Sequence, residues 1–241
     1  MNIHFIQHEI FEAPGAYHSW ALSRGHHISC SKIYEHEPLP ERVDDIDLLI
    51  VMGGPQSPDT SIDECPHFNG AAEIEFIRKC HEKQKMIIGV CLGAQLLGEA
   101  FGAKYEHSPQ KEIGTFPIIL TKEGVADKNV KVLGATLTVG HWHGDMPGLS
   151  AESKILAFSE GCPRQIIAYS PYAYGFQCHL EFNEEIVKLL IAEENDLQLQ
   201  SQTHPFIQSP QGILNFDYTV MNEKLYDFLD ELSKKAGVDN K

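Results

Sequence analysis

The residue whose setting best suits covalent chemistry is Cys91, in the segment GVCLGAQ at residues 89–95. Apolar residues before it predict a buried strand, and Leu92, Leu96 and Leu97 after it predict one face of a helix. A nucleophile on a sharp turn from strand to helix is typical of hydrolases, and the neighbouring glycines permit such a turn. Unpaired N–H groups at the start of the helix favour a thiolate, so we expect the pKa of Cys91 to lie below its ordinary value of about 8.5. Taken alone, a G-x-C-x-G pattern is as typical of a buried structural cysteine.

A cysteine nucleophile needs a base, and the segment GFQCHLE at residues 175–181 supplies His179. We expect this segment to be a strand, so Gln177, His179 and Glu181 point to one side, with about 6.6 Å between successive members. Glu181 can then hydrogen-bond to His179, hold its tautomer and stabilise the imidazolium that forms when it takes the thiol proton. A lone His-x-Glu pattern is more often surface decoration, so this interpretation depends on Cys91.

A glycine-rich turn, MGGPQS at residues 52–57, follows another apolar run. Standing alone, it would be an ordinary Gly-Pro turn. Beside the Cys91 turn, a glycine N–H and the N–H of Leu92 form a pair of donors that can hold a developing oxyanion. The spacing of the turn matches neither a dinucleotide-binding fingerprint nor a Walker phosphate loop.

The first hundred residues alternate between apolar runs and helical patterns, which predicts an α/β fold. The apolar runs lie at residues 3–6, 27–33, 46–52 and 86–90, and the helical patterns lie before Gly25, at residues 71–83 and from Cys91 to a stop at Gly102. Right-handed crossovers between such strands give a doubly wound, mainly parallel central sheet with helices on both faces. The glycine-rich turn and Cys91 would meet at the carboxyl edge of that sheet.

Beyond Gly102 the pattern changes to successive strands. They are expected at residues 113–120, 131–139, 154–158, 165–169 and 174–180, with no helix between them, and predict a block of antiparallel hairpins. The rest is predicted to be helical, with an apolar stripe on the last helix made of Met221, Leu225, Phe228, Leu229 and Leu232. For 241 residues we expect one domain, 1–241, with a core of about residues 1–190 and a helical C-terminal extension of about residues 191–241.

Composition excludes several classes of protein. Hydrophobic residues at 42% and charged residues at 22% are values of a soluble globular protein, and a net charge of −15 argues against attraction to nucleic acid or an anionic membrane. The N-terminus lacks a basic leader, and no run of 18 apolar residues occurs, so we expect a cytoplasmic protein. Six cysteines form no C-x-x-C pair and no zinc-ligand spacing, so we expect reduced, mostly buried thiols.

Together and in this order, the M-G-G-P, G-V-C-L-G-A-Q and H-L-E segments resemble class I glutamine amidotransferase domains, especially stand-alone relatives of the glutaminase domain of GMP synthetase. The resemblance spans about residues 46–181 and implies a flavodoxin-like fold that needs no cofactor. It implies that Cys91 attacks the side-chain amide of glutamine and releases ammonia from a γ-glutamyl thioester. His179 would accept and later donate the proton, with Glu181 behind it.

The same resemblance implies the residues that hold the substrate. Gly54 and Leu92 would supply the oxyanion N–H groups, and Gly53 and Gln95 would contact the bound glutamine.

The segment VGHWHGD at residues 139–145 resembles the S-H-G-D region of the family, whose backbone holds the α-amino and α-carboxylate groups. Trp142 stands where the synthetases usually have serine, and it is followed by His143. His141 and His143 could instead form a metal pair, but no third ligand at suitable spacing is visible, so no metal is predicted. The synthetases usually have H-P-E where this chain has H-L-E, a change that points to the stand-alone branch.

The acceptor of the ammonia and the use of the last residues stay open. The synthetases carry an ATP-binding domain after the glutaminase domain, whereas this chain ends about 60 residues after Glu181, so we expect a separate synthetase subunit as partner. Residues 205–210 would cap the site or dock that partner, and an oligomer is compatible with the sequence. Two alternatives remain: a hydrolase of γ-glutamyl peptides, and a non-catalytic regulatory or binding module with the same fold.

Overall fold

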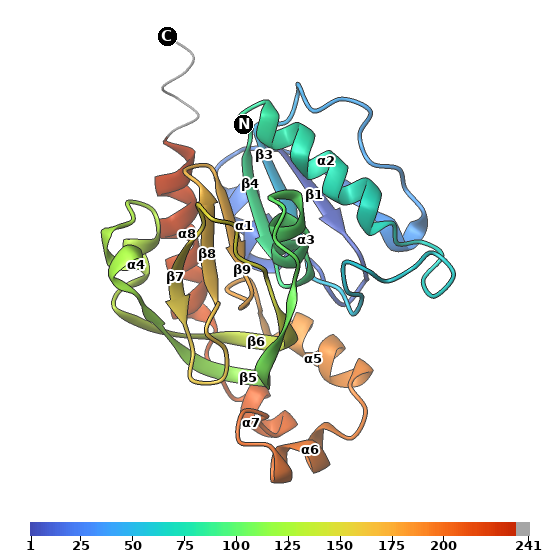
Figure 1. The fold of residues 1–241 in the computed structure, drawn as a ribbon. Helices are drawn as coiled ribbons and strands as arrows, with labels where there is room; N and C mark the ends of the chain where they lie inside the picture. Colours follow the sequence, from blue (N-terminus) through green and yellow to red (C-terminus); the bar gives the residue numbers. More distant parts are fainter. Residues whose placement is uncertain (235–241) are drawn as a thin grey trace.

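A single mixed sheet forms the centre of the protein in a computed structural model that describes residues 1–234 (Figure 1). In that part of the chain nine strands follow the order β2-β1-β3-β4-β9-β8-β7-β5-β6. The parallel half comprises β1 (Asn2–Gln7), β2 (His27–Lys32), β3 (Leu48–Val51), β4 (Met86–Val90) and β9 (Ala173–Phe176). The antiparallel half comprises β5 (Glu106–Leu120), β6 (Thr136–Met146), β7 (Lys154–Phe158) and β8 (Ile166–Ser170). The predicted α/β fold with a parallel core and an antiparallel block is confirmed.

Helices cover both faces of the parallel half, with α2 and α3 on one face and α1 and α8 on the other (Figure 1). The α-helices are α1 (Gly15–Ser23), α2 (Gly70–Glu82), α3 (Leu92–Ala100), α4 (Lys122–Ala126), α5 (Glu184–Glu193), α6 (Leu197–Thr203), α7 (Pro210–Leu214) and α8 (Thr219–Ser233). Two 3₁₀ helices, η1 (Ile33–Glu35) and η2 (Val130–Leu133), complete the elements. None of these helices combines the length and the apolarity needed to cross a membrane.

The continuous apolar run of β3 reflects burial on both faces of the sheet. Leu48 and Ile50 join the core that includes Trp20 of α1, whereas Leu49 and Val51 join the core beneath α2 and α3. Side chains alternate along a strand, so a strand covered on both sides needs apolar residues at every position. This explains why β3 and β4 could be located from their sequence.

The expected strand at residues 131–139 is wrong in its first half, where the chain forms η2 instead. The side chain of Asp127 accepts hydrogen bonds from the backbone N–H groups of Asn129 and Val130, which favours a helical turn there. Gly134 then ends the turn with a φ of 85° before β6 begins. The expectation of no helix between the later strands is also wrong, because α4 and η2 connect β5 to β6.

The expected strand at residues 174–180 is shorter, because β9 ends at Phe176. It also belongs to both halves of the sheet, since it runs parallel to β4 and antiparallel to β8. Beyond it the chain stays next to β6 through a bridge in which Gly140 and His179 exchange backbone hydrogen bonds of 2.9 and 2.8 Å. His179 is therefore held by an irregular segment at the carboxyl edge of the parallel strands.

Helix α8 and residues 205–210 pack closely on the rest of the protein. All five members of the apolar stripe on α8 are buried in the main core, as expected. Residues 205–210 lie along β5, where the backbone of Ile113 bonds to Phe206 and Gln208, and the Gln208 amide bonds to Thr115. This contact fixes the segment against the sheet.

Candidate active site

Cys91 lies at a strained turn between β4 and α3. Its φ of 50° and ψ of −109° are unusual for a residue with a side chain. The glycines beside it are required by close packing: a Cβ on Gly93 would lie 2.0 Å from the carbonyl oxygen of Val51, and one on Gly89 would lie 2.2 Å from that of Gly93. The local sequence therefore builds the sharp turn that the G-x-C-x-G pattern predicts.

His179 and Glu181 form a buried pair. The Nδ1 atom of His179 lies 2.6 Å from Oε1 of Glu181, and the imidazole stacks on Phe182 with 4.2 Å between ring centroids. Burial lowers the pKa of the imidazole, but the charge and hydrogen bond of Glu181, together with Cys91, raise the pKa of His179 well above its ordinary value. Nε2 of His179, which faces away from Glu181, has no hydrogen-bond partner of standard geometry among the described residues.

The thiol of Cys91 is held by its neighbours. It donates to the backbone carbonyl of Trp142 with 3.7 Å between sulfur and oxygen, and it accepts from Nε2 of Gln177 at 3.4 Å. The amide of Gln95 in turn donates to Oε1 of Gln177 at 3.3 Å. A chain of two amides thus connects the predicted substrate-binding residue Gln95 to the sulfur.

Burial raises the pKa of the Cys91 thiol, and this effect exceeds the opposing influence of His179 and of the Leu92 N–H. The expected lowering of this pKa is therefore wrong. The helix N-terminus is present, but Cys91 is only 5% exposed and has lost the water that would stabilise a thiolate. Formation of the thiolate consequently depends on a base at hand.

A small pocket of about 150 Å³ opens beside Cys91. Among the predicted site residues, those that line it are Gly54, Cys91, Gln95, Trp142 and His143. The pocket has room for about five water molecules at about 30 Å³ each, which is the scale of one small metabolite. Two larger hollows, of about 740 and 930 Å³, lie over β7 and β8, and neither is lined by a cysteine.

Four predicted residues are not on the wall of this pocket: Gly53, Leu92, His179 and Glu181. The carbonyl of Gly53 is bonded to Nδ1 of His8 at 2.9 Å, and its Cα faces the carboxylate of Glu12, where an added Cβ would lie 2.4 Å from Oε2. The N–H of Leu92 acts on the neighbouring Cys91 thiol and favours a lower pKa of that thiol.

Four polar residues of the pocket wall were not predicted as site residues: Gln56, Ser57, Lys111 and Asp145. Lys111 pairs with Glu194 at 2.8 Å, and Asp145 pairs with His107 at 2.6 Å and accepts from Ser57. The pocket therefore presents a positive and a negative side chain on its wall. Asp145 could have been found from its place in the VGHWHGD segment, whereas Lys111 has no local signal.

Glu12 is a further buried acid close to the site, in the loop that precedes α1. Burial raises its pKa to about 7, and the charge of Glu181 adds to the rise while that of His179 opposes it. It too lacks a recognisable motif in the sequence.

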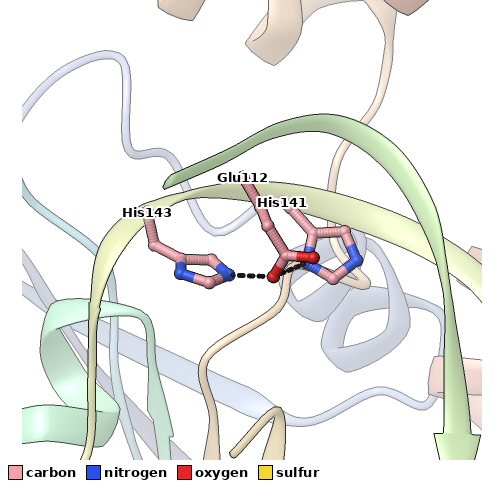
Figure 2. A group of neighbouring side chains, drawn as sticks. All are labelled: Glu112, His141 and His143. Carbon is pink, nitrogen blue, oxygen red and sulfur yellow. Dashed lines mark ion pairs between the residues drawn. The ribbon is translucent and has the colours of Figure 1, made fainter. Parts of the chain in front are cut away.

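A second cluster of titratable side chains lies on the β5–β6 hairpin. Glu112 of β5 joins His141 and His143 of β6, the pair for which the sequence offered no third ligand (Figure 2). Burial lowers the pKa of His141 to about 3, while the two histidines hold the pKa of Glu112 below its ordinary value against the effect of its own burial. Carboxylate and imidazole groups of this kind are metal ligands in proteins.

The model of the family glutamine amidotransferase class-I matches residues 16–193. The chain belongs to this family. The glutamine amidotransferase-like protein YfeJ of Salmonella typhimurium is 49% identical over 233 residues, which are 97% of this chain and 98% of YfeJ. Anthranilate synthase component 2 of Helicobacter pylori is 29% identical over 164 residues, 64% of this chain and 83% of that protein. The crystal structure of SMU.1228c, at 54% identity, has a TM-score of 0.96 and covers 97% of this chain and all of its own.

Proposed function

We propose that the protein hydrolyses the side-chain amide of glutamine through a γ-glutamyl thioester on Cys91. The observation that carries this proposal is the Cys91 thiol on a strained turn at the small pocket, close to the buried His179–Glu181 pair. The family name, glutamine amidotransferase class-I, states that glutamine is the source of the amide nitrogen, which supports glutamine as the substrate.

The first step is attack by sulfur. His179 takes the thiol proton at Nε2 while the sulfur of Cys91 bonds to the amide carbon, and the C=O electron pair moves to oxygen. Glu181 holds the proton on Nδ1 and stabilises the imidazolium, the role that an acid has behind a catalytic histidine. Catalytic hydrogen bonds often align only when substrate binds, so the thiol can rest on Trp142 in the free protein.

The oxyanion that forms needs donors, and we assign the N–H groups of Gly54 and Leu92 to it. Its collapse breaks the carbon–nitrogen bond, and His179 returns the proton to the leaving nitrogen so that ammonia departs. Water then attacks the thioester with His179 as base, which releases glutamate and restores the thiol of Cys91. The sum is glutamine plus water to glutamate plus ammonia.

Charge on the pocket wall supports an amino acid as substrate. Lys111 is suited to an α-carboxylate and Asp145 to an α-ammonium group, while the backbone of Trp142 and His143 borders the same space. A volume of about 150 Å³ favours glutamine over a longer γ-glutamyl peptide, which would have to extend outside.

The ammonia is proposed to pass to a separate partner that aminates its own substrate. The relative named anthranilate synthase component 2 is, by that name, one component of a synthase. A partner of that kind suits this chain as well.

Ammonia release from glutamine tests the proposal. Wild type should exceed Cys91→Ala by at least about 10³-fold, since removal of a nucleophile leaves only residual catalysis. Cys30→Ser is the matched control, because this cysteine lies on β2 away from the pocket and should leave the rate unchanged.

Labelling with a diazoketone analogue of glutamine tests the reactivity of Cys91 in a way that does not depend on a partner protein. One equivalent should attach to wild type and Cys30→Ser and none to Cys91→Ala. The proposal fails if wild type neither releases ammonia above Cys91→Ala nor becomes labelled.

A further inference from the structure

Strand pairing brings three metal-binding side chains to one face of the β5–β6 hairpin. Glu112 is the register partner of His143, and His141 lies two residues before His143 on the same face. Oε2 of Glu112 lies 3.3 Å from Nε2 of His143 and 3.6 Å from Nδ1 of His141, and the three ligand atoms lie within 4.8 Å of one another. All three side chains are at most 1% exposed. Figure 2 shows the carboxylate between the two imidazole rings.

The hydrogen bonds of His141 leave its Nδ1 atom without a partner. Nε2 of this ring lies 3.2 Å from the carbonyl oxygen of Phe116, and because a carbonyl only accepts, Nε2 carries the proton. In the neutral ring Nδ1 then presents a lone pair, and it is aimed at the carboxylate of Glu112 from 3.6 Å, too far for an N–H···O hydrogen bond. Two electron-rich groups thus face each other inside the protein with nothing positive between them.

We propose that Glu112, His141 and His143 bind one divalent transition-metal ion, with zinc as the best fit. Zinc bonds to imidazole nitrogen and carboxylate oxygen at about 2.0–2.2 Å, so tetrahedral ligand atoms lie about 3.3–3.6 Å apart. The two separations from Glu112 match that spacing. Two histidines and one glutamate are also a ligand set that zinc takes in proteins, with a fourth position left for another donor.

Two of the three ligands, His141 and Glu112, have the supporting hydrogen bonds that metal ligands usually have, whereas Nδ1 of His143 has no partner among the described residues. A ligating histidine normally donates its other N–H to a carbonyl or carboxylate, as His141 does to Phe116. The carboxylate of Glu112 accepts from the Ser159 hydroxyl at 2.8 Å and from the Gln165 amide at 2.7 Å.

A bound ion would also affect the residue between the two histidines. Trp142 supplies the carbonyl that accepts from the Cys91 thiol. Fixing His141 and His143 to Glu112 would therefore fix this stretch of β6 beside the pocket. The ion takes no part in the proposed chemistry at sulfur, and its role is structural.

Metal content of purified protein tests the site directly. Untagged wild type from zinc-supplemented cells should contain about one zinc per chain by plasma mass spectrometry, whereas His141→Gln and Glu112→Gln should contain less than about one fifth of that. His107→Gln is the matched control, since His107 also faces a carboxylate across the β5–β6 pair but at an exposed position with no third ligand. Cys91→Ser should keep its zinc, which separates this site from thiolate binding.

Because the site is buried, the ion must enter before the hairpin closes, so wild type is also refolded from denaturant with and without zinc. Protein refolded with zinc should melt about 5–10 °C higher, as expected for a ligand in large excess over its Kd. Refolding with Co²⁺ should give the visible bands of a four-coordinate site in wild type and in Cys91→Ser. These wild-type measurements decide the question even if the variants do not fold.

The proposal is overturned if wild type holds less than about one tenth of an equivalent of metal and zinc leaves its Tm unchanged on refolding. It is equally overturned if His141→Gln folds and retains its zinc. In either case the cluster is a buried polar network without an ion.

Discussion

Removing the charge of Glu12 should change how the stability of the protein depends on pH. Glu12 is 5% exposed, its carboxylate lies against the Cα of Gly53, and burial raises its pKa from 4.5 to about 7. A carboxyl whose pKa is higher in the folded state binds its proton more tightly there. Its contribution to stability is therefore fully present below pH 4.5 and is lost as the pH rises through about 7.

The size of this loss follows from the two pKa values. Moving the pKa from 4.5 to about 7 corresponds to about 3 kcal/mol, at about 1.4 kcal/mol for each tenfold change in proton affinity. Between pH 5 and pH 8 the wild type should lose about 2 to 3 kcal/mol of unfolding free energy from this group alone. Residue 12 cannot titrate in Glu12→Gln, so the variant does not lose this free energy. The unfolding free energy of the variant relative to that of wild type should therefore rise by about 2 to 3 kcal/mol between pH 5 and pH 8.

Urea unfolding at pH 5 and pH 8 measures the difference. The midpoint of Glu12→Gln relative to wild type should rise by about 1 M between the two pH values. Glu41→Gln is the control, because Glu41 is exposed and its replacement should follow wild type at both pH values. If the difference between wild type and Glu12→Gln were the same at pH 5 and pH 8, the carboxyl would not titrate in this range and the reasoning would be refuted.

Three further substitutions test the site and its support. Glu181→Gln should lower ammonia release by about 10²- to 10⁴-fold with the fold retained by circular dichroism, because an amide neither holds the proton on Nδ1 of His179 nor stabilises the imidazolium; a loss below tenfold would contradict its role. Gly93→Ala should give little soluble protein, because its Cβ would meet the backbone of Val51; normal yield and Tm would contradict this. Phe228→Ala should cost about 3–5 kcal/mol in urea unfolding and exposed Val220→Ala less than about 0.5 kcal/mol; equal effects would show that α8 is not part of the core.

The elements that were predicted correctly are those whose signal is local. The runs that became β3 and β4 are apolar at every position because both faces of the sheet are covered, and the need for glycine at Gly89 follows from a backbone contact with Gly93 within one strand–helix unit. The α8 stripe is likewise a local pattern of one helix. A few consecutive residues are enough to determine such features.

The errors come from effects that a short window of sequence does not contain. Val130 and its apolar neighbours have the composition of a strand, but the side chain of Asp127 nearby bonds to the backbone and turns them into η2. The pKa of Cys91 was predicted from the helix N-terminus alone, whereas the burial that raises it comes from the packing of several elements. Lys111 and Glu12 reach the site through tertiary packing and carry no motif.

The position of His179 relative to Cys91 depends on the order of strands in the sheet. Residues 174–180 were predicted to belong to the antiparallel block, yet the residues that became β9 also run parallel to β4, with Phe176 as the register partner of Val90. Strands β4 and β9 therefore end at the same edge of the sheet, and the residues that follow them lie side by side. The hydrogen bond from the N–H of Cys91 to the carbonyl of Phe176 shows this proximity. The same reasoning applies to Glu112, which meets His143 only because β5 and β6 pair in one particular register. Sequence motifs identify the reactive side chains of this protein, whereas the pairing of the strands determines which of these side chains come into contact.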